Sequence, residues 1–257
     1  MKKAVLVASF GTTHEDTRSK TIDAVTNDIA AIMDGYEVRT AFTSSIIRKI
    51  LEKREQSVDN VQQALTKLRD EGYEEVLIQP LHVISGEEFH NVIRDTTSFR
   101  ADFKKIEIGG ALLSSVDDYK AVVRAFDEEI KTVDADTAVI FMGHGTSHPA
   151  NSAYPCLQSV FMAEGYDRVY IATVEGYPEF NDILEVLKGK DYKKVKLIPL
   201  MLVAGDHAKN DMAGEEEDSW KSILESEGFE VDVLLRGMGE MKDIRDIYVE
   251  HIRSLVR

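Results

Sequence analysis

The sequence predicts an α/β protein made of two similar halves, each with a parallel β-sheet covered by helices. Short β-branched runs alternate with segments of helical periodicity along the chain, and this order repeats after the middle. With 257 residues, the chain is long enough to bury a core in each half. The polar stretch 131–136 marks the expected boundary between halves of residues 1–131 and 132–257. The C-terminal helix of the second half is able to pack back on the first.

Apolar runs rich in β-branched residues predict the strands, and apolar residues at helical spacing predict the helices. In the first half, the expected strands are 3–8, 36–42, 75–80 and 106–112, and the expected helices are 16–33, 46–54 and 58–71. A further helix begins after a capping-box pattern at 115–118 and extends its apolar face to Ile130.

In the second half, the expected strands are 138–142, 169–174, 194–199 and 230–235, and the expected helices are 154–164, 179–187, 219–227 and 242–256. Alternation of this kind is typical of parallel strands with helices on both faces of the sheet. Open parallel sheets bind ligands beyond the carboxyl ends of their strands. We therefore expect a cleft between the halves, lined by the loops that follow the strands.

The loops at these strand ends also match between the halves. Residues 80–88 align with 199–207 and share Pro, Leu and Gly, while residues 10–12 align with 144–146. The matched pairs are Phe10 with His144, Ser44 with Glu175 and Glu88 with His207. The two halves therefore present different side chains at equivalent places.

Composition excludes several classes of protein. The net charge of −15 argues against nucleic-acid binding, and no apolar run reaches the ~18–20 residues that a membrane-spanning helix needs. The first residues do not form a signal peptide, so we expect a cytoplasmic protein. The single cysteine, Cys156, forms no internal disulfide and is expected to be a small buried residue. GxGxxG and Walker A motifs are absent. No organic cofactor is expected, and a homo-oligomer is left open.

Three residues at strand ends of the second half predict a site for a divalent metal ion. His144 lies between two glycines after a buried strand, Glu175 follows the next strand, and His207 follows the third. Imidazole and carboxylate are common ligands of divalent transition metals. The residues are 31 and 32 positions apart, so the prediction depends on the fold that brings the strand ends together. The alternative for His144 is a loop histidine that caps a helix.

Other residues at strand ends are candidates for catalysis or substrate binding. Glu88 is a carboxylate that can accept protons, or it begins an exposed helix. Phe10 can pack on a flat ligand or in the core, and His82 either lines the cleft or is a buried structural histidine. His148 is a candidate to support the metal ligands. The residues assigned to substrate binding are Ser9, Phe10, Gly11, Thr12, Thr13, His82 and Ser85.

Four segments together resemble the anaerobic cobalt chelatases of cobalamin biosynthesis. These segments are 9–13, 143–146, 174–178 and 199–207, and the resemblance extends over essentially the whole chain. The family, the sirohydrochlorin cobaltochelatases, belongs to the class II chelatases, which include ferrochelatase. The resemblance implies a chelatase fold of two Rossmann-like α/β domains and the insertion of Co²⁺ into sirohydrochlorin with release of two protons. It also implies that His144, Glu175 and His207 hold the cobalt and that His144 accepts a proton.

The same histidine nitrogen cannot bind a metal and accept a proton at once. We therefore expect the two roles of His144 to be sequential or the proton transfer to be shared with Glu88. The many carboxylates of the substrate need basic partners, for which Arg48, Arg54 and Lys209 are candidates. The alternatives are a tetrapyrrole or metal carrier without turnover, a chelatase that prefers Fe²⁺ or Ni²⁺, and a metal-dependent hydrolase.

Overall fold

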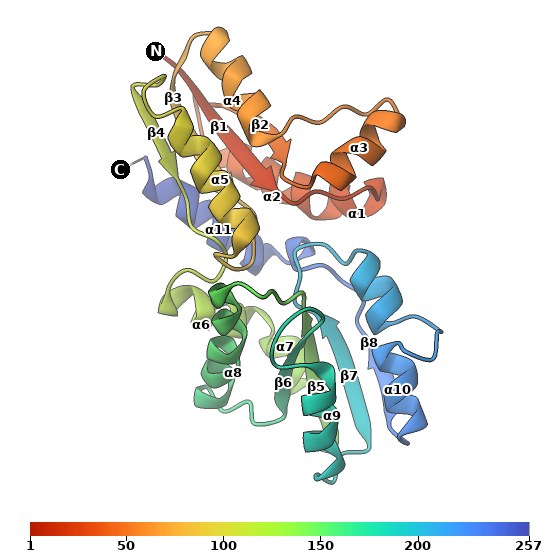
Figure 1. Cartoon of the computed structure of the whole chain (residues 1–257). Helices are drawn as coiled ribbons and strands as arrows, with labels where there is room; N and C mark the ends of the chain where they lie inside the picture. The colour runs from red at the N-terminus through yellow and green to blue at the C-terminus, as the bar shows by residue number, and fades with distance from the viewer. Residues whose placement is uncertain (257) are drawn as a thin grey trace. The chain divides into compact units, whose positions relative to one another are not determined.

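The computed structural model describes residues 1–256 and divides into two compact units, each an α/β layer structure with a parallel sheet (Figure 1). Unit 1 contains residues 1–114 and the C-terminal segment from Lys242, and unit 2 is Ser115–Met241. The predicted fold class is therefore confirmed. The division between the units precedes the helix that begins at Val116, whereas the polar stretch at 131–136 suggested a boundary after that helix.

The sheet of unit 1 has the strand order β2-β1-β3-β4. Its strands are β1 (Lys2–Ser9), β2 (Glu37–Phe42), β3 (Tyr73–Pro80) and β4 (Lys105–Ile108), and all their pairings are parallel. The central strand β1 is buried from Ala4 to Ser9 and is apolar up to Ala8, as expected for a strand with helices on both faces. The carboxyl ends of β1, β2 and β3 consequently lie side by side at one edge of this sheet.

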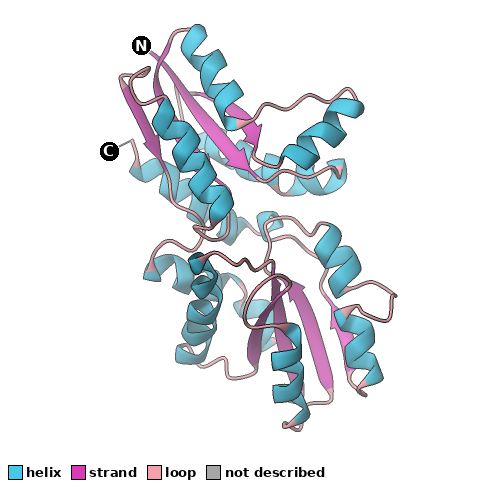
Figure 2. Cartoon of the chain, in the orientation of Figure 1, coloured by secondary structure: helices cyan, strands magenta, loops and turns pink. Residues whose placement is uncertain are grey.

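Helices cover both faces of the unit 1 sheet (Figure 2). They are α1 (Glu15–Lys20), α2 (Ile22–Ile32), α3 (Ser45–Lys53), α4 (Val61–Asp70), α5 (Glu87–Ser98) and α11 (Lys242–Ser254). The C-terminal α11 is attached to this unit by an ion pair between Arg245 and Asp28, with 2.7 Å between Nε and Oδ2. The buried Tyr248 hydroxyl also donates to the Leu81 carbonyl at 3.2 Å.

Unit 2 repeats this topology with the strand order β6-β5-β7-β8. Its strands are β5 (Thr137–Gly143), β6 (Val169–Thr173), β7 (Lys194–Pro199) and β8 (Glu230–Val233). Its helical segments are α6 (Val116–Ala125), α7 (Asp127–Lys131), η1 (Pro149–Ser152), α8 (Ala153–Ala163), α9 (Phe180–Lys188), η2 (His207–Met212), α10 (Trp220–Ser226) and η3 (Met238–Glu240). The same edge of this sheet gathers the ends of β5, β6 and β7.

Several elements differ from the sequence-based prediction. The helix predicted over 16–33 is divided at Thr21, whose hydroxyl donates to the Thr17 carbonyl at 2.6 Å. The helix predicted from Val116 to Ile130 likewise divides into α6 and α7 at Phe126. The strand predicted over 106–112 ends at Ile108, and residues 109–111 have no regular secondary structure.

The structure also decides two predictions about single residues. Cys156 is exposed rather than buried, because the buried side of α8 is formed by Ala153, Tyr154, Leu157 and Phe161. Glu87 and Glu88 do begin a helix, α5, which the sequence analysis considered only as an alternative. Within the described residues, no helix combines the length and the apolar character needed to cross a membrane.

Candidate metal centre

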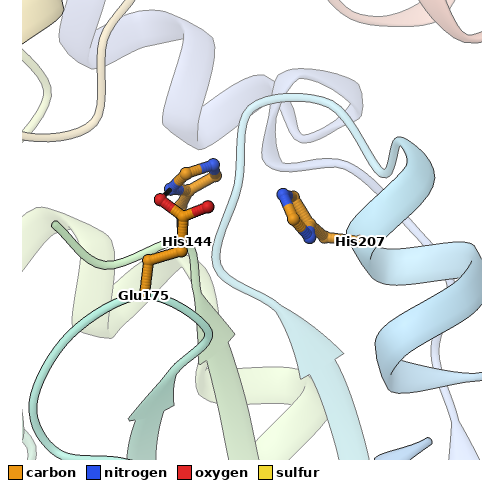
Figure 3. Close-up of side chains that lie close together, drawn as sticks. All are labelled: His144, Glu175 and His207. Carbon is orange, nitrogen blue, oxygen red and sulfur yellow. Dashed lines mark ion pairs between the residues drawn. The ribbon is translucent and has the colours of Figure 1, made fainter.

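The three candidate metal ligands lie together at the carboxyl edge of the unit 2 sheet. His144 directly follows β5, Glu175 lies two residues after β6, and His207 begins η2 after β7. Because these strands are neighbours in the order β6-β5-β7, residues far apart in sequence become close in space. One ligand atom from each side chain lies within 4.8 Å of the other two. Figure 3 shows the three side chains converging above the strand ends.

The geometry leaves the cluster open to solvent. The Nδ1 atom of His144 lies 3.8 Å from Oε2 of Glu175, and the two imidazole rings are perpendicular with centroids 4.9 Å apart. The side chains of His144 and Glu175 are 45% and 58% exposed, and that of His207 is 37% exposed. A metal ion held here would therefore keep coordination positions accessible to a second ligand.

Backbone contacts hold the His144 loop against the Glu175 loop. The Glu175 amide donates to the His144 carbonyl at 2.8 Å, which continues the pairing of β5 with β6 past the last strand residues. Gly145 has a φ of +79°, and a Cβ atom at this position would lie 2.6 Å from the Gly176 nitrogen. Glycine at 145 therefore permits both the turn and the close approach of the two loops.

Each histidine has a hydrogen-bond partner that orients its ring. Nδ1 of His144 lies 3.0 Å from the Gly145 carbonyl, which can only accept, so the contact places the proton on Nδ1 and leaves the Nε2 lone pair available. Nδ1 of His207 is hydrogen-bonded to the carboxylate of Asp211. A carboxylate that accepts from one ring nitrogen fixes the orientation of the ring and leaves the other nitrogen for a metal.

Asp211 is a residue that the sequence analysis missed. It lies four positions after His207 in η2, a π-helical segment, and π-helical turns are frequent at functional sites. The spacing of four residues is the signal that was available, since residues i and i+4 share a face of an ordinary helix. This signal was weak because no helix was predicted at this place.

The donor set suits a borderline divalent cation. Two imidazole nitrogens and one carboxylate oxygen fit ions such as Co²⁺, Fe²⁺, Ni²⁺ and Zn²⁺ better than Ca²⁺ or Mg²⁺, which prefer all-oxygen sites. Three protein ligands with an open side also suit a site that releases its metal or acts on it. The arrangement can therefore bind a transition metal ion and present it to another molecule.

The candidate substrate-binding residues lie at the matching edge of unit 1. Ser9 ends β1 and is buried, Phe10 is 49% exposed, and Thr12 is buried. The Thr13 carbonyl accepts a hydrogen bond from Arg54 at 2.8 Å, so this basic candidate holds the loop after β1. Of the remaining candidates, Gly11 lies in that loop and Ser85 in the turn before α5.

The other titratable candidates have different surroundings. Glu88 lies in the first turn of α5, where a negative charge is favourable with the helix dipole. His82 follows β3, and neither of its buried ring nitrogens has a hydrogen-bond partner among the described residues. Burial lowers the pKa of His82 to about 4, so its imidazole is neutral near pH 7.

His148 accepts a hydrogen bond from the Ala150 amide through Nδ1 and so caps η1. Lys209 lies in η2.

Comparison with known proteins identifies similar sequences over the full length of the chain. Residues 3–257 match the family described as cobalt chelatase (CbiK). The chain is 40% identical over 255 residues to the sirohydrochlorin cobaltochelatase of Salmonella typhimurium. This alignment covers 99% of this chain and 96% of that protein. It is 35% identical over 258 residues to the sirohydrochlorin cobaltochelatase CbiKC of Nitratidesulfovibrio vulgaris, covering 99% of this chain and 91% of that protein.

Solved structures show the same fold at lower sequence identity. SirB from Bacillus subtilis, solved with Fe³⁺, superposes with a TM-score of 0.70 at 13% identity. The superposition covers 99% of this chain and 96% of SirB. The two four-stranded parallel sheets therefore form a chelatase-like fold.

Proposed function

The chain belongs to the cobalt chelatase (CbiK) family and is therefore a chelatase, and we propose that it inserts Co²⁺ into sirohydrochlorin for cobalamin biosynthesis. The observation that carries this proposal is the cluster of His144, Glu175 and His207 in a chain that aligns over its full length with sirohydrochlorin cobaltochelatases. Co²⁺ is a substrate here, not a resident cofactor. Insertion changes no oxidation state, so the reaction needs no organic cofactor.

In the proposed reaction, the three residues bind Co²⁺ and deliver it to the macrocycle. The macrocycle loses two pyrrole protons as the metal enters, so a base is needed near the site of metal transfer. His144 is the proposed base: its Nε2 lone pair is available, and once the metal has left it can take up a proton. Glu88 is the second carrier of protons in this proposal. An exposed, three-ligand site supports the delivery step because the macrocycle can displace the protein ligands one at a time.

The tetrapyrrole contacts are proposed for the loops of unit 1 that follow β1 and β3. Phe10 offers an exposed ring to a flat ligand, and the remaining proposed contacts are Ser9, Gly11, Thr12, Thr13, His82 and Ser85. Arg48, Arg54 and Lys209 are the proposed partners of the substrate carboxylates. The cytoplasmic location stays a prediction.

Anaerobic assays with purified protein test this function. Co²⁺ and sirohydrochlorin are mixed with the protein, and the absorption spectrum of the macrocycle is followed against a control without protein. We expect insertion to be accelerated and product to accumulate well beyond the protein concentration. Product that stops at one equivalent would instead identify a carrier, and no acceleration would refute the proposal.

The same assay with Fe²⁺ and Ni²⁺ addresses the choice of metal. Two histidines and a glutamate do not select Co²⁺ by affinity, because Ni²⁺ binds more tightly to most sites of this kind. We therefore expect all three ions to be inserted in vitro. A hydrolytic screen with added Co²⁺, Zn²⁺ or Mn²⁺ should give no activity.

A further inference from the structure

The side chain of Asn151 forms a bridge between the two loops that carry His144 and Glu175. Its Oδ1 accepts a hydrogen bond from the Thr146 amide at 3.1 Å, and its Nδ2 donates to the Tyr177 carbonyl at 2.5 Å. Thr146 lies two residues after His144, and Tyr177 lies two residues after Glu175. One amide group therefore uses both a donor and an acceptor to join these loops.

The space around this bridge is filled by the amide. A Cβ atom on Gly176 would lie 2.4 Å from Oδ1 of Asn151 and 3.0 Å from the Thr146 nitrogen. Glycine at 176 thus lets the backbone of the Glu175 loop approach the Asn151 amide directly. Asn151 itself is in η1, which is anchored to unit 2 by the buried start of α8, Ala153 and Tyr154. The bridge therefore connects both loops to a buried part of the unit.

We propose that Asn151 is a positioning residue that sets the separation of His144 and Glu175 before the metal binds. The proposal rests on the function assigned above to these two residues. Without the bridge, the loops would still be joined by the backbone bond from Glu175 to His144, but the segments beyond it could separate. The free chain would then sample many separations of the ligand atoms, and Co²⁺ binding would have to order them. Asn151 acts through backbone groups and does not itself bind the metal.

Gln158 provides a matched control in the same unit. Its side chain makes the same two kinds of bond, donating from Nε2 to the Val169 carbonyl at 2.7 Å and accepting at Oε1 from the Ile171 amide at 2.8 Å. These bonds hold the edge strand β6 near its start, away from the strand ends that carry the ligands. Loss of the Gln158 amide should therefore lower stability without changing the metal site.

The test compares Asn151→Ala, Asn151→Asp and Gln158→Ala in the full-length protein. Co²⁺ is titrated without tetrapyrrole, and the dissociation constant and the visible d–d spectrum of bound Co²⁺ are recorded. Loss of a group that hydrogen-bonds a metal ligand typically weakens metal binding by 10- to 100-fold. Asn151 contacts only the backbone beside the ligands, so Asn151→Ala should raise the Kd by roughly 10-fold, the lower end of that range, and alter the spectrum. Asn151→Asp keeps the acceptor for Thr146 but places a carboxylate oxygen against the Tyr177 carbonyl, which also only accepts, so it should weaken Co²⁺ binding as well. Gln158→Ala should keep the wild-type Kd and spectrum.

Steady-state kinetics separate positioning from general destabilisation. We expect Asn151→Ala to raise the KM for Co²⁺ and to leave the KM for sirohydrochlorin unchanged. The inference is overturned if Asn151→Ala, or Asn151→Asp should the first fail to fold, keeps the wild-type Kd and spectrum or changes them no more than Gln158→Ala. Failure of wild-type protein to insert Co²⁺ would instead refute the proposed function, so the two failures are distinguishable.

Discussion

The two units of this protein end their central strands with the same backbone hydrogen bonds but with different side chains. Three amide-to-carbonyl bonds that follow the strands of unit 1 each have an equivalent in unit 2. In unit 1 they run from Leu81 to Ala8, from Ser44 to Phe10 and from Leu112 to His82. Their equivalents in unit 2 run from Leu200 to Met142, from Glu175 to His144 and from Met238 to Met201. These pairs agree with the alignment of the two halves that the sequence predicts. The framework at the strand ends is therefore a property of the repeated fold, and it does not depend on the residues that it presents.

The chemistry differs because three presented side chains differ. Unit 2 presents His144, Glu175 and His207, while unit 1 presents Phe10, Ser44 and Glu88 at the matched positions. In unit 1, Ser44 caps α3 by accepting from the Ile47 amide, which is a structural role. One scaffold thus carries the proposed metal site in unit 2. At the matched positions of unit 1 it carries only one of these donor types, a carboxylate. Function here resides in the side chains grafted on the fold.

The segments after the third strand differ in backbone as well. In unit 1, Glu88 belongs to α5, a regular helix of 12 residues. In unit 2, the matched His207 begins η2, a π-helical segment of 6 residues that also contains Asp211. Within this segment, Asp211 is hydrogen-bonded to Nδ1 of His207, so unit 2 differs from unit 1 both in the ring at this position and in the carboxylate behind it.

The largest effect should follow removal of His144. His144→Ala removes a metal ligand and the proposed base together, and loss of a base alone typically costs 10²- to 10⁴-fold in rate. We expect insertion to fall by at least about 10²-fold even at saturating Co²⁺. His207→Ala and Glu175→Ala should instead weaken Co²⁺ binding first, with part of the rate recovered at high Co²⁺. Initial rates across a Co²⁺ series measure this, and near wild-type turnover in His144→Ala would assign the base elsewhere.

A second prediction tests Asp211, whose carboxylate is hydrogen-bonded to the proposed ligand His207. Asp211→Ala should raise the Kd for Co²⁺ by about 10- to 100-fold, because His207 loses the partner that orients it. Asp211→Asn keeps an acceptor for Nδ1 and should recover part of the affinity. The measurement is a Co²⁺ titration without tetrapyrrole.

Asp246→Ala is the control for the loss of one negative charge. Asp246 forms an ion pair with Lys242 at a spacing of four residues, and its side chain is 48% exposed, as is that of Asp211. We expect this variant to bind Co²⁺ like the wild-type protein. Equal losses in the Asp211→Ala and Asp246→Ala variants would mean that net charge, and not ring orientation, determines the affinity.

Much of this architecture could be predicted from the sequence. The strand ends were located within one or two residues at β1, β3, β5 and β7, because buried parallel strands are continuous apolar runs with clear ends. The three proposed metal ligands then followed from the order of the strands. The division of the 16–33 helix at Thr21 could not be seen in this way, since apolar spacing continues through it while a hydroxyl-to-backbone bond interrupts it.

The residues that support the proposed ligands were harder to predict. Asn151 contacts Tyr177 across 26 positions, and its partners are backbone groups, which leave no pattern in side-chain type. Asp211 lies in a π-helical segment, at a place where the sequence pattern predicted no helix. Sequence patterns therefore indicate which residues carry chemistry more readily than which residues position them.

A third prediction uses the matched pair His82 and Met201. Burial lowers the pKa of His82 to about 4, whereas an ordinary histidine in the unfolded chain has a pKa of about 6.5. As the pH falls below about 6.5, the unfolded chain takes up a proton that folded His82 does not, so stability is lost between about pH 6.5 and 4. Between about pH 7.5 and 5, the loss from this residue is on the order of 2 kcal/mol.

His82→Met places the unit 2 residue at this position and should remove that part of the pH dependence. Hydrogen exchange of the β1 and β3 amides in metal-free protein measures the stability of unit 1 at the two pH values. We expect the wild-type protein to lose more protection on acidification than the variant does. Identical pH dependence in both would show that His82 takes up its proton at an ordinary pH in the folded protein, which a proton titration of its ring followed by NMR would report directly.

The smallest effect is predicted for Co²⁺ binding when the unit 1 residues are changed. Phe10→Ala and Glu88→Gln alter residues that match two proposed ligands of unit 2, yet neither belongs to the cluster around His144. If unit 2 alone holds the metal, the Kd of both variants for Co²⁺ should change by less than roughly 10-fold. That factor is the smallest loss expected when a group that hydrogen-bonds a metal ligand is removed. The rate or the KM for sirohydrochlorin should nevertheless change, because Phe10 is the proposed support for the flat ring and Glu88 the proposed second proton acceptor. Co²⁺ titrations and sirohydrochlorin kinetics on the same preparations separate these effects.

A loss of Co²⁺ affinity in Glu88→Gln as large as that in His207→Ala would mean that both copies of the repeat hold the metal, and the division of roles between the units would be wrong.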